Sequence, residues 1–208
     1  MASVIDSNDS FTRFWNDVLV AKFERFRNIM LDGLSYHSAG PLARLDLPRG
    51  ARAVDVGCGW GDTAIELARK AGPEGSVLGL DCCDAFLEKG RRDAAAEGLR
   101  NVRFVVADVQ TYPFETTFDF AFSRFGMMFF ANPVAAMRNV RRALVPGGRA
   151  MFITWRTIDD NPWLGTPKSV VSQFLPPPGA DAQTCGPGPF SMKRAGRCCA
   201  RPIPAPPP

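Results

Sequence analysis

Three glycines at alternate positions stand out in the stretch VDVGCGWGDTA, residues 54–64. Gly57, Gly59 and Gly61 follow a short apolar segment that contains Asp55, and they directly precede a segment with helical periodicity. Glycine allows a left-handed backbone and a close approach by another group, and the first turn of a helix offers free N–H groups. The spacing therefore predicts a ligand-binding turn between a strand and a helix of an open α/β sheet.

Two further carboxylates end later apolar segments. Asp81 closes GSVLGLD, about twenty residues beyond the glycines, where a carboxylate can accept hydrogen bonds from ribose hydroxyls. Asp108 closes VRFVVAD, and in a parallel sheet it would lie close enough to accept a hydrogen bond from an exocyclic amine such as that of adenine. The alternative is that each acid caps the helix that follows it. The three coordinated positions favour a nucleoside site.

The type of nucleoside follows from the glycine spacing. A dinucleotide fingerprint would need a glycine at position 62, where the chain has Asp62, and this carboxylate would repel a pyrophosphate. No Gly-Lys-Ser/Thr sequence follows the glycines, which excludes a phosphate-binding P-loop. We therefore expect a ligand with nucleoside and amino-acid ends and no phosphate. A dehydrogenase remains a distant alternative.

Strands alternate with helices over the part of the chain that carries these residues. Strand patterns cover 51–59, 75–81, 102–108, 118–125 and 149–156, and helix patterns cover 62–72, 85–98 and 132–144. Thr63 and Glu66 predict a capping box, Asn132 before Pro133 predicts an N-cap, and the fifth strand follows a Pro-Gly-Gly turn. Because the strands are apolar on both faces, we expect a doubly wound parallel α/β sheet covered by helices on each side.

At 208 residues the chain is long enough for one well-buried domain, which we place at residues 1–175. Apolar residues at helical spacing over 11–30 predict an N-terminal helix or helix pair. We place lid helices over about residues 1–45, and they would either cover the core or close over a ligand. Residues 176–208 are rich in proline and lack regular periodicity, so we expect a disordered or loosely packed tail. Such a segment could alternatively be a ligand for a proline-recognition domain.

Composition narrows the classes of function. The net charge is +4, but Lys and Arg are scattered among acids, which indicates a solvated surface and no nucleic-acid partner. The six cysteines have no Cys-x-x-Cys spacing and the only histidine is His37, so no metal site is expected. With no apolar run of about 18 residues and no secretory leader pattern, we expect a cytoplasmic protein without a membrane span.

The chain resembles the class I S-adenosylmethionine-dependent methyltransferases in the order and spacing of five motifs. These motifs are VDVGCGWG, LGLD, VVAD, FDFAFSRFGMMFF and LVPGGR. The sequence is most similar to the type 11 group, which includes the ubiquinone and menaquinone biosynthesis C-methyltransferases. The resemblance covers about residues 40–165. It implies the Rossmann-like class I methyltransferase fold, S-adenosyl-L-methionine as cofactor, and methyl transfer to a small-molecule acceptor.

The resemblance also implies a cofactor site. In it Asp81 with Cys82 would hold the ribose, and Asp108 with Val109 would hold the adenine. The other implied residues would face the methionine and sulfonium end: Asp55, Gly57, Cys58, Gly59, Gly61, Ser123, Arg124 and Phe125. His37 is the candidate general base, if the acceptor must lose a proton, although a lone histidine is more often a surface or packing residue.

The acceptor and the C-terminal part of the chain are less defined. No Asn/Asp-Pro-Pro-aromatic sequence follows the fourth strand, which argues against methylation of nucleic-acid bases. The apolar stretch FGMMFF at 125–130 suggests an apolar or aromatic acceptor, or it serves core packing alone. Relatives of this family continue into a last antiparallel strand pair, which this chain lacks, and we expect a truncated or frameshifted methyltransferase. Alternatives are a folded S-adenosylmethionine-binding domain without turnover and an inactive fragment. The oligomeric state is not indicated.

Overall fold

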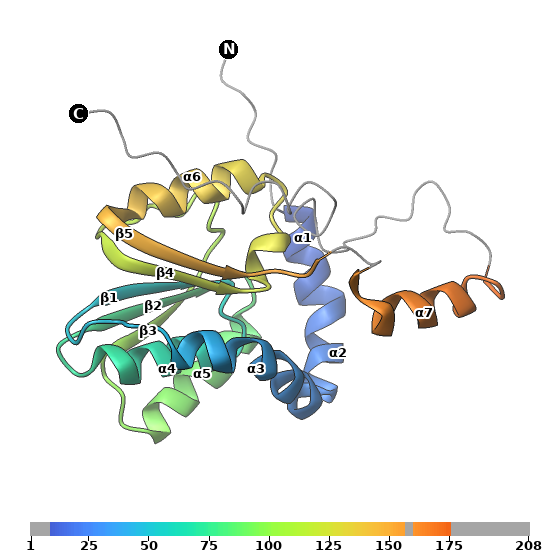
Figure 1. Cartoon of the computed structure of the whole chain (residues 1–208), viewed down its shortest axis with the longest axis horizontal. Coiled ribbons are helices and arrows are strands. Elements are labelled where there is room, and N and C mark those ends of the chain that lie inside the picture. Colours follow the sequence, from blue (N-terminus) through green and yellow to red (C-terminus); the bar gives the residue numbers. More distant parts are fainter. Residues whose placement is uncertain (1–8, 157–159, 176–208) are drawn as a thin grey trace, which may run out of the picture.

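The computed structural model describes residues 9–156 and 160–175, and its centre is a twisted five-stranded sheet (Figure 1). The strand order is β3-β2-β1-β4-β5, and every neighbouring pair is parallel. The strands are β1 (Arg52–Val56), β2 (Ser76–Asp81), β3 (Val102–Val106), β4 (Phe118–Arg124) and β5 (Leu144–Ile153). The order reverses beside β1, so the carboxyl ends of β1 and β4 form the switch point where such sheets bind ligands.

Helices cover both faces of the sheet, which confirms the predicted doubly wound α/β fold. Figure 1 shows α6 (Pro133–Ala143) on one face, and α4 (Asp62–Ala71), α5 (Asp84–Ala96) and α3 (Arg27–Ala43) on the other. Each face has its own apolar core: Leu67 of α4 and Leu42 of α3 pack on one side, and Val140 of α6 on the other. Removal of these apolar surfaces from water is the main stabilising term for both layers.

The N-terminal segment is helical, as its periodicity predicts. α1 (Asp9–Phe14), the π-helical turn η1 (Trp15–Leu19) and α2 (Val20–Arg25) form one run, and Phe26 separates this run from α3 with a non-helical φ of −112°. Trp15 and Phe23 pack against Trp60 and Phe86, which follow β1 and β2. The helices are therefore fixed by aromatic contacts above the carboxyl ends of the strands.

Two predicted turn features are wrong. α4 has no capping box. Gly61 is its N-cap, with φ of +80° and no side-chain capping hydrogen bond, and the Thr63 hydroxyl donates to Asp55. The Pro-Gly-Gly turn does not precede the fifth strand, because β5 begins at Leu144 and includes it. Residues 145–148 of β5 form a bulge opposite Asp119 of β4. β5 ends at Ile153.

β5 and β3 are the two edge strands of the sheet in the described part of the chain, where no antiparallel strand follows β5. After β5 the chain forms α7 (Pro162–Val171), and a short 3₁₀ turn, η2 (Gly126–Met128), follows β4. The predicted tail at 176–208 lies outside the described residues. No described helix is both long enough and apolar enough to cross a membrane.

Candidate functional site

The predicted glycine turn joins β1 to α4 and is fixed to β2. Gly57, Gly59 and Gly61 all have positive φ angles, of 66°, 54° and 80°. The Leu80 carbonyl accepts hydrogen bonds from the N–H groups of Gly57 and Cys58, at 2.7 and 3.0 Å. The turn is thus held by the neighbouring strand and does not depend on its own short-range contacts alone.

The three glycines serve different physical needs. A Cβ on Gly57 would lie 2.7 Å from the Cα of Gly126, and one on Gly61 would lie 2.5 Å from the ring of Phe104. A Cβ on Gly59 would meet no atom within 4 Å. Gly57 and Gly61 are therefore required by packing as well as by φ, whereas Gly59 lies beside open space that a ligand can approach.

Asp81 links the glycine turn to the end of β2. Its Oδ2 accepts a hydrogen bond from the Gly59 N–H at 2.9 Å, and its Oδ1 accepts one from the Cys83 N–H at 3.0 Å. The side chain is partly buried, and desolvation raises the pKa of its carboxyl despite these hydrogen bonds. Each carboxylate oxygen can accept a second hydrogen bond, which suits a vicinal diol.

Asp55 lies in the middle of the sheet with no exposed surface. Its Oδ2 accepts the Thr63 hydroxyl at 2.5 Å, while its Oδ1 is buried without a hydrogen-bond partner. Burial raises the pKa of Asp55 to about 7, against the lowering effects of the Thr63 hydrogen bond and of the Arg124 charge. An unsatisfied buried acceptor of this kind fits a ligand that brings a hydrogen-bond donor.

The end of β4 supplies two side chains whose polar groups are already engaged. The Ser123 hydroxyl donates to the Val56 carbonyl at 2.6 Å and accepts the Met127 N–H at 3.2 Å. Arg124, whose side chain is only 7% exposed, donates to Asp62 at 2.8 Å and to the hydroxyl of Ser38 on α3 at 3.1 Å. These residues fasten β4 to β1, α4 and α3 around the glycine turn.

Asp108 and Val109 follow the end of β3. The Asp108 carboxylate accepts the Gln110 N–H at 3.0 Å and the Gln110 side-chain amide at 3.3 Å, and Val109 is buried below it. Gln110 also accepts the Asn132 N–H at 2.7 Å, so it joins this loop to the start of α6. Gln110 was not predicted from the sequence, because a glutamine in a loop belongs to no recognisable motif.

Phe125 and His37 meet in an aromatic cluster at the carboxyl end of β5. Phe125 has a left-handed backbone, with φ of 62°, and its ring stacks on Trp155 with centroids 4.3 Å apart. The exposed His37 lies edge-on to both rings, with centroids 5.6 and 5.1 Å away. Trp155 was missed in the sequence, although its position just after β5 follows the same rule as Asp81 after β2.

The N-terminal helices contact the turn itself. The Asn16 amide donates to the Cys82 carbonyl at 3.1 Å, and the indole N–H of Trp60 donates to Glu24 at 2.5 Å. Cys58 is buried within the turn, and burial raises the pKa of its thiol, which makes it a packing group. The helices therefore cover this end of the sheet, including the turn.

The site carries more negative than positive charge. Asp55, Asp62, Asp81 and Asp108 surround the carboxyl ends of β1 to β3, and Arg124 is the cation among them. A pyrophosphate would be repelled by this arrangement, whereas a ligand with ammonium or sulfonium groups would be attracted.

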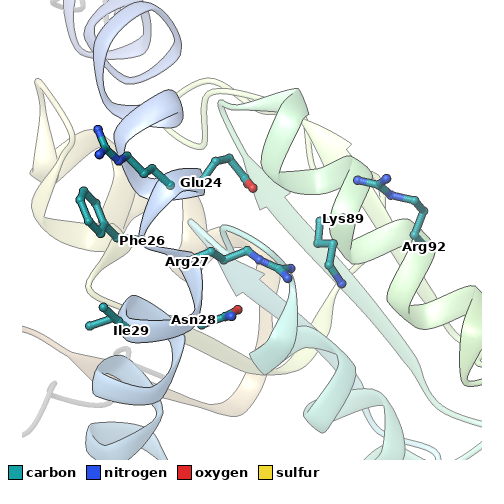
Figure 2. Close-up of a pocket in the computed structure, with 8 residues that line it drawn as sticks. Glu24, Phe26, Arg27, Asn28, Ile29, Lys89 and Arg92 are labelled. Carbon is teal, nitrogen blue, oxygen red and sulfur yellow. The ribbon is translucent and has the colours of Figure 1, made fainter.

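An open groove with a cavity volume of about 620 Å³ lies between the junction of α2 and α3 and the side of α5 (Figure 2). None of the predicted site residues lines it. Figure 2 shows Arg27 and Lys89 extending toward one another across it, with Glu24 on the same side. Lys89 forms an ion pair with Asp93, and Glu24 accepts a hydrogen bond from the Trp60 indole. These two charged side chains of the groove therefore already have partners within the protein.

Comparison with known proteins identifies the same part of the chain. Residues 53–148, from β1 into β5, match the family described as a methyltransferase domain. A demethylmenaquinone methyltransferase of Geobacillus kaustophilus is 35% identical over 113 residues, which are 54% of this chain and 48% of that protein. The chain spans about half the length of the curated relatives it matches first.

Solved structures support the assignment of the fold. The YcgJ protein of Bacillus subtilis has a TM-score of 0.54 and 26% identity, covering 61% of this chain and 54% of its own. A methyltransferase of Thiobacillus denitrificans, in complex with S-adenosyl-L-homocysteine, has a TM-score of 0.50 and 26% identity, covering 56% and 47%. The sheet order, the glycine turn and these matches show that residues 53–148 have the class I S-adenosylmethionine-dependent methyltransferase fold.

Proposed function

We propose that the chain binds S-adenosyl-L-methionine over the glycine turn and transfers its methyl group to a small apolar or aromatic acceptor. One observation carries the cofactor part of this proposal. The glycine turn, Asp81 and Asp108 follow β1, β2 and β3, which are neighbours in the sheet, so the three features lie along one edge. The Gly59 N–H to Asp81 hydrogen bond joins two of them directly.

The residues present fit the two ends of such a cofactor. Asp81 would accept hydrogen bonds from the ribose hydroxyls, and Asp108 would accept one from the adenine amine. The buried Oδ1 of Asp55, which has no partner in the protein, would take a donor from the amino-acid end, directly or through water. The other predicted residues, Gly57, Cys58, Gly61 and Ser123, would shape the turn and hold it to the sheet.

The bound cofactor supplies an already activated methyl group, so the tasks left to the protein are alignment and removal of water. The Phe125 and Trp155 rings, which stack on each other, would line the acceptor side, and aromatic rings favour a nearby cationic group. His37, at the edge of the two rings, is our candidate to accept a proton from the acceptor. We assign these roles from position, since all three residues cluster at the switch-point end of the sheet.

The acceptor class rests on two observations. The aromatic cluster around Phe125 extends to the exposed Trp163 on α7, whose ring centroid is 5.4 Å from that of Trp155, and a planar ring could stack on it. The matched relatives are demethylmenaquinone methyltransferases, so the acceptor of those proteins is demethylmenaquinone. For this chain we propose a planar aromatic acceptor.

Calorimetric titration with S-adenosyl-L-homocysteine tests the cofactor site. We expect binding that Asp81→Asn weakens at least about tenfold, a loss of about 1.4 kcal/mol, because the amide cannot accept from both ribose hydroxyls as the carboxylate can. Asp93→Asn, which changes a carboxylate near the other end of α5, is the matched control and should leave the affinity unchanged. Absence of binding by the folded chain would contradict the proposal.

Turnover needs its own measurement. Transfer of a labelled methyl group from S-adenosyl-L-methionine to a set of dihydroxynaphthalenes and phenols would show the activity and the acceptor class. We expect His37→Gln to lower the transfer rate without changing the affinity for S-adenosyl-L-homocysteine. Binding of S-adenosyl-L-homocysteine without transfer to any acceptor would instead favour the non-catalytic binding domain.

A further inference from the structure

We propose that Cys82, Cys83 and Asp81 form a binding site for a thiophilic divalent metal ion at the carboxyl end of β2. The two thiol sulfurs lie 3.7 Å apart. One potential ligand atom from each of the three residues lies within 4.8 Å of the others. No metal site was expected from the sequence, because the chain has no Cys-x-x-Cys spacing and only one histidine. The two cysteines proposed here are adjacent in the sequence, a spacing that this rule does not cover.

The sulfur separation fits a tetrahedral ion. Two thiolates bound at about 2.3 Å to one tetrahedral zinc ion have sulfurs about 3.8 Å apart. In the metal-free chain the same distance corresponds to a weak thiol–thiol hydrogen bond. An ion can therefore bind both sulfurs almost where they lie, with a carboxylate oxygen of Asp81 as third ligand and a water molecule as fourth.

The fold holds the two cysteines rigidly enough for this role. The Cys83 N–H donates to Asp81, and Cys83 has an extended backbone directly before α5. The Cys82 carbonyl accepts the Asn16 amide, which fixes the preceding peptide. Cys83 is buried beside Trp60, whereas Cys82 is partly exposed, so an ion would enter from the side of Cys82.

Binding has a defined proton balance. Both cysteines coordinate as thiolates, so each bound ion displaces two thiol protons into the solvent, and the affinity rises with pH. Softer ions with stronger preference for sulfur, such as Cd²⁺, compete best with these protons.

An ion in this site would also occupy Asp81. The carboxylate cannot serve a metal ion and the ribose hydroxyls of a nucleoside equally well, so the two ligands should compete. This consequence rests on the proposed function, whereas the metal site itself does not. The chain would then bind its cofactor less tightly when thiophilic ions are abundant.

Cd²⁺ titration is the first test, read by the thiolate-to-cadmium charge-transfer absorption in the ultraviolet at pH 8. The full chain is used in a background in which the cysteines outside the described residues are serine: Cys185→Ser, Cys198→Ser and Cys199→Ser. We expect one Cd²⁺ per chain and an affinity at least about tenfold weaker in Cys82→Ser or Cys83→Ser. Cys58→Ser is the matched control, and unchanged binding by Cys82→Ser would overturn the proposal.

A second measurement avoids any change at the pair, in case serine there disturbs folding. In the same background, Cd²⁺ should slow the alkylation of Cys82 by iodoacetamide at least about tenfold, as measured by mass spectrometry of the Cys82 peptide. An unchanged alkylation rate at saturating Cd²⁺ would overturn the site. Competition is then tested by titrating S-adenosyl-L-homocysteine with and without Cd²⁺. Equal affinities would refute competition while leaving the metal site intact, and no binding without Cd²⁺ would count against the proposed function alone.

Discussion

The free energy of unfolding is expected to fall as the pH rises from 5.5 to 8, because of Asp55. Its carboxyl has a pKa of about 7 in the folded chain, against the ordinary aspartate value of 3.8. Between these two values the folded state holds a proton that the unfolded state has lost. The stabilisation is fully present below the lower pKa and is lost as the pH rises through the upper one.

Linkage gives the size of the effect. With pKa values of about 7 and 3.8, the Asp55 term lowers the free energy of unfolding by about 2 kcal/mol between pH 5.5 and pH 8. The cause is desolvation, since Asp55 has no exposed surface and one of its oxygens has no partner. Deprotonation leaves a buried charge that Arg124, already paired with Asp62, compensates only in part.

Urea unfolding followed by tryptophan fluorescence, without ligand, measures this term when the native chain is compared with Asp55→Asn. Asparagine has nearly the same shape, can still accept the Thr63 hydroxyl and does not titrate. We expect the native chain to lose about 2 kcal/mol more than the variant between the two pH values. Asp81, whose pKa is also raised, contributes to the pH dependence of both proteins, so the difference between them reports Asp55 together with its charge interaction with Asp81. Parallel pH dependences in the two proteins would refute the buried, protonated Asp55.

Three further substitutions test the packing around the site, each by urea unfolding. Gly61→Ala should destabilise the chain by about 3 kcal/mol, because the new Cβ would meet the Phe104 ring. Gly98 also has a positive φ, but a Cβ there would meet no atom within 4 Å, so Gly98→Ala should cost only about 1 kcal/mol. Equal losses would show that the Phe104 ring moves aside at little cost. Ser123→Ala should cost about 1–3 kcal/mol through two lost hydrogen bonds, and a neutral effect would mean that water replaces them. Asn132→Ala should cost about 1 kcal/mol as an N-cap of α6, and a loss near zero would contradict the cap.

The first three strands of the sheet could be predicted from the sequence because they are short apolar runs with a glycine or an aspartate at or just after their ends. That pattern located β1, β2 and β3 and placed Asp81 and Asp108 at one edge of the sheet. The left-handed turn at Gly57 to Gly61 was also predictable, since few other residues adopt such a backbone. Local chemistry was sufficient for these features.

Features that depend on which strands are neighbours were not predictable. Gly126 is required because the end of β4 lies against the glycine turn, where its Cβ would be 2.6 Å from the Val56 carbonyl. The predicted capping box failed for a related reason. Asp55 is buried and needs a donor, and it takes the Thr63 hydroxyl, which a single-sequence rule assigns to the helix start. Trp155 meets Phe125 only because β5 pairs with β4.

The fold tolerates several carboxylates at one edge because each is compensated differently. Asp55 is largely protonated below about pH 7, Asp62 is paired with Arg124, and Asp81 accepts two backbone N–H groups. Asp108 accepts both donors of the glutamine two residues later. Backbone and amide donors lower the cost of each negative charge without cancelling it, so the edge remains negative. A site with a negative edge of this kind attracts a cationic ligand, such as a sulfonium compound.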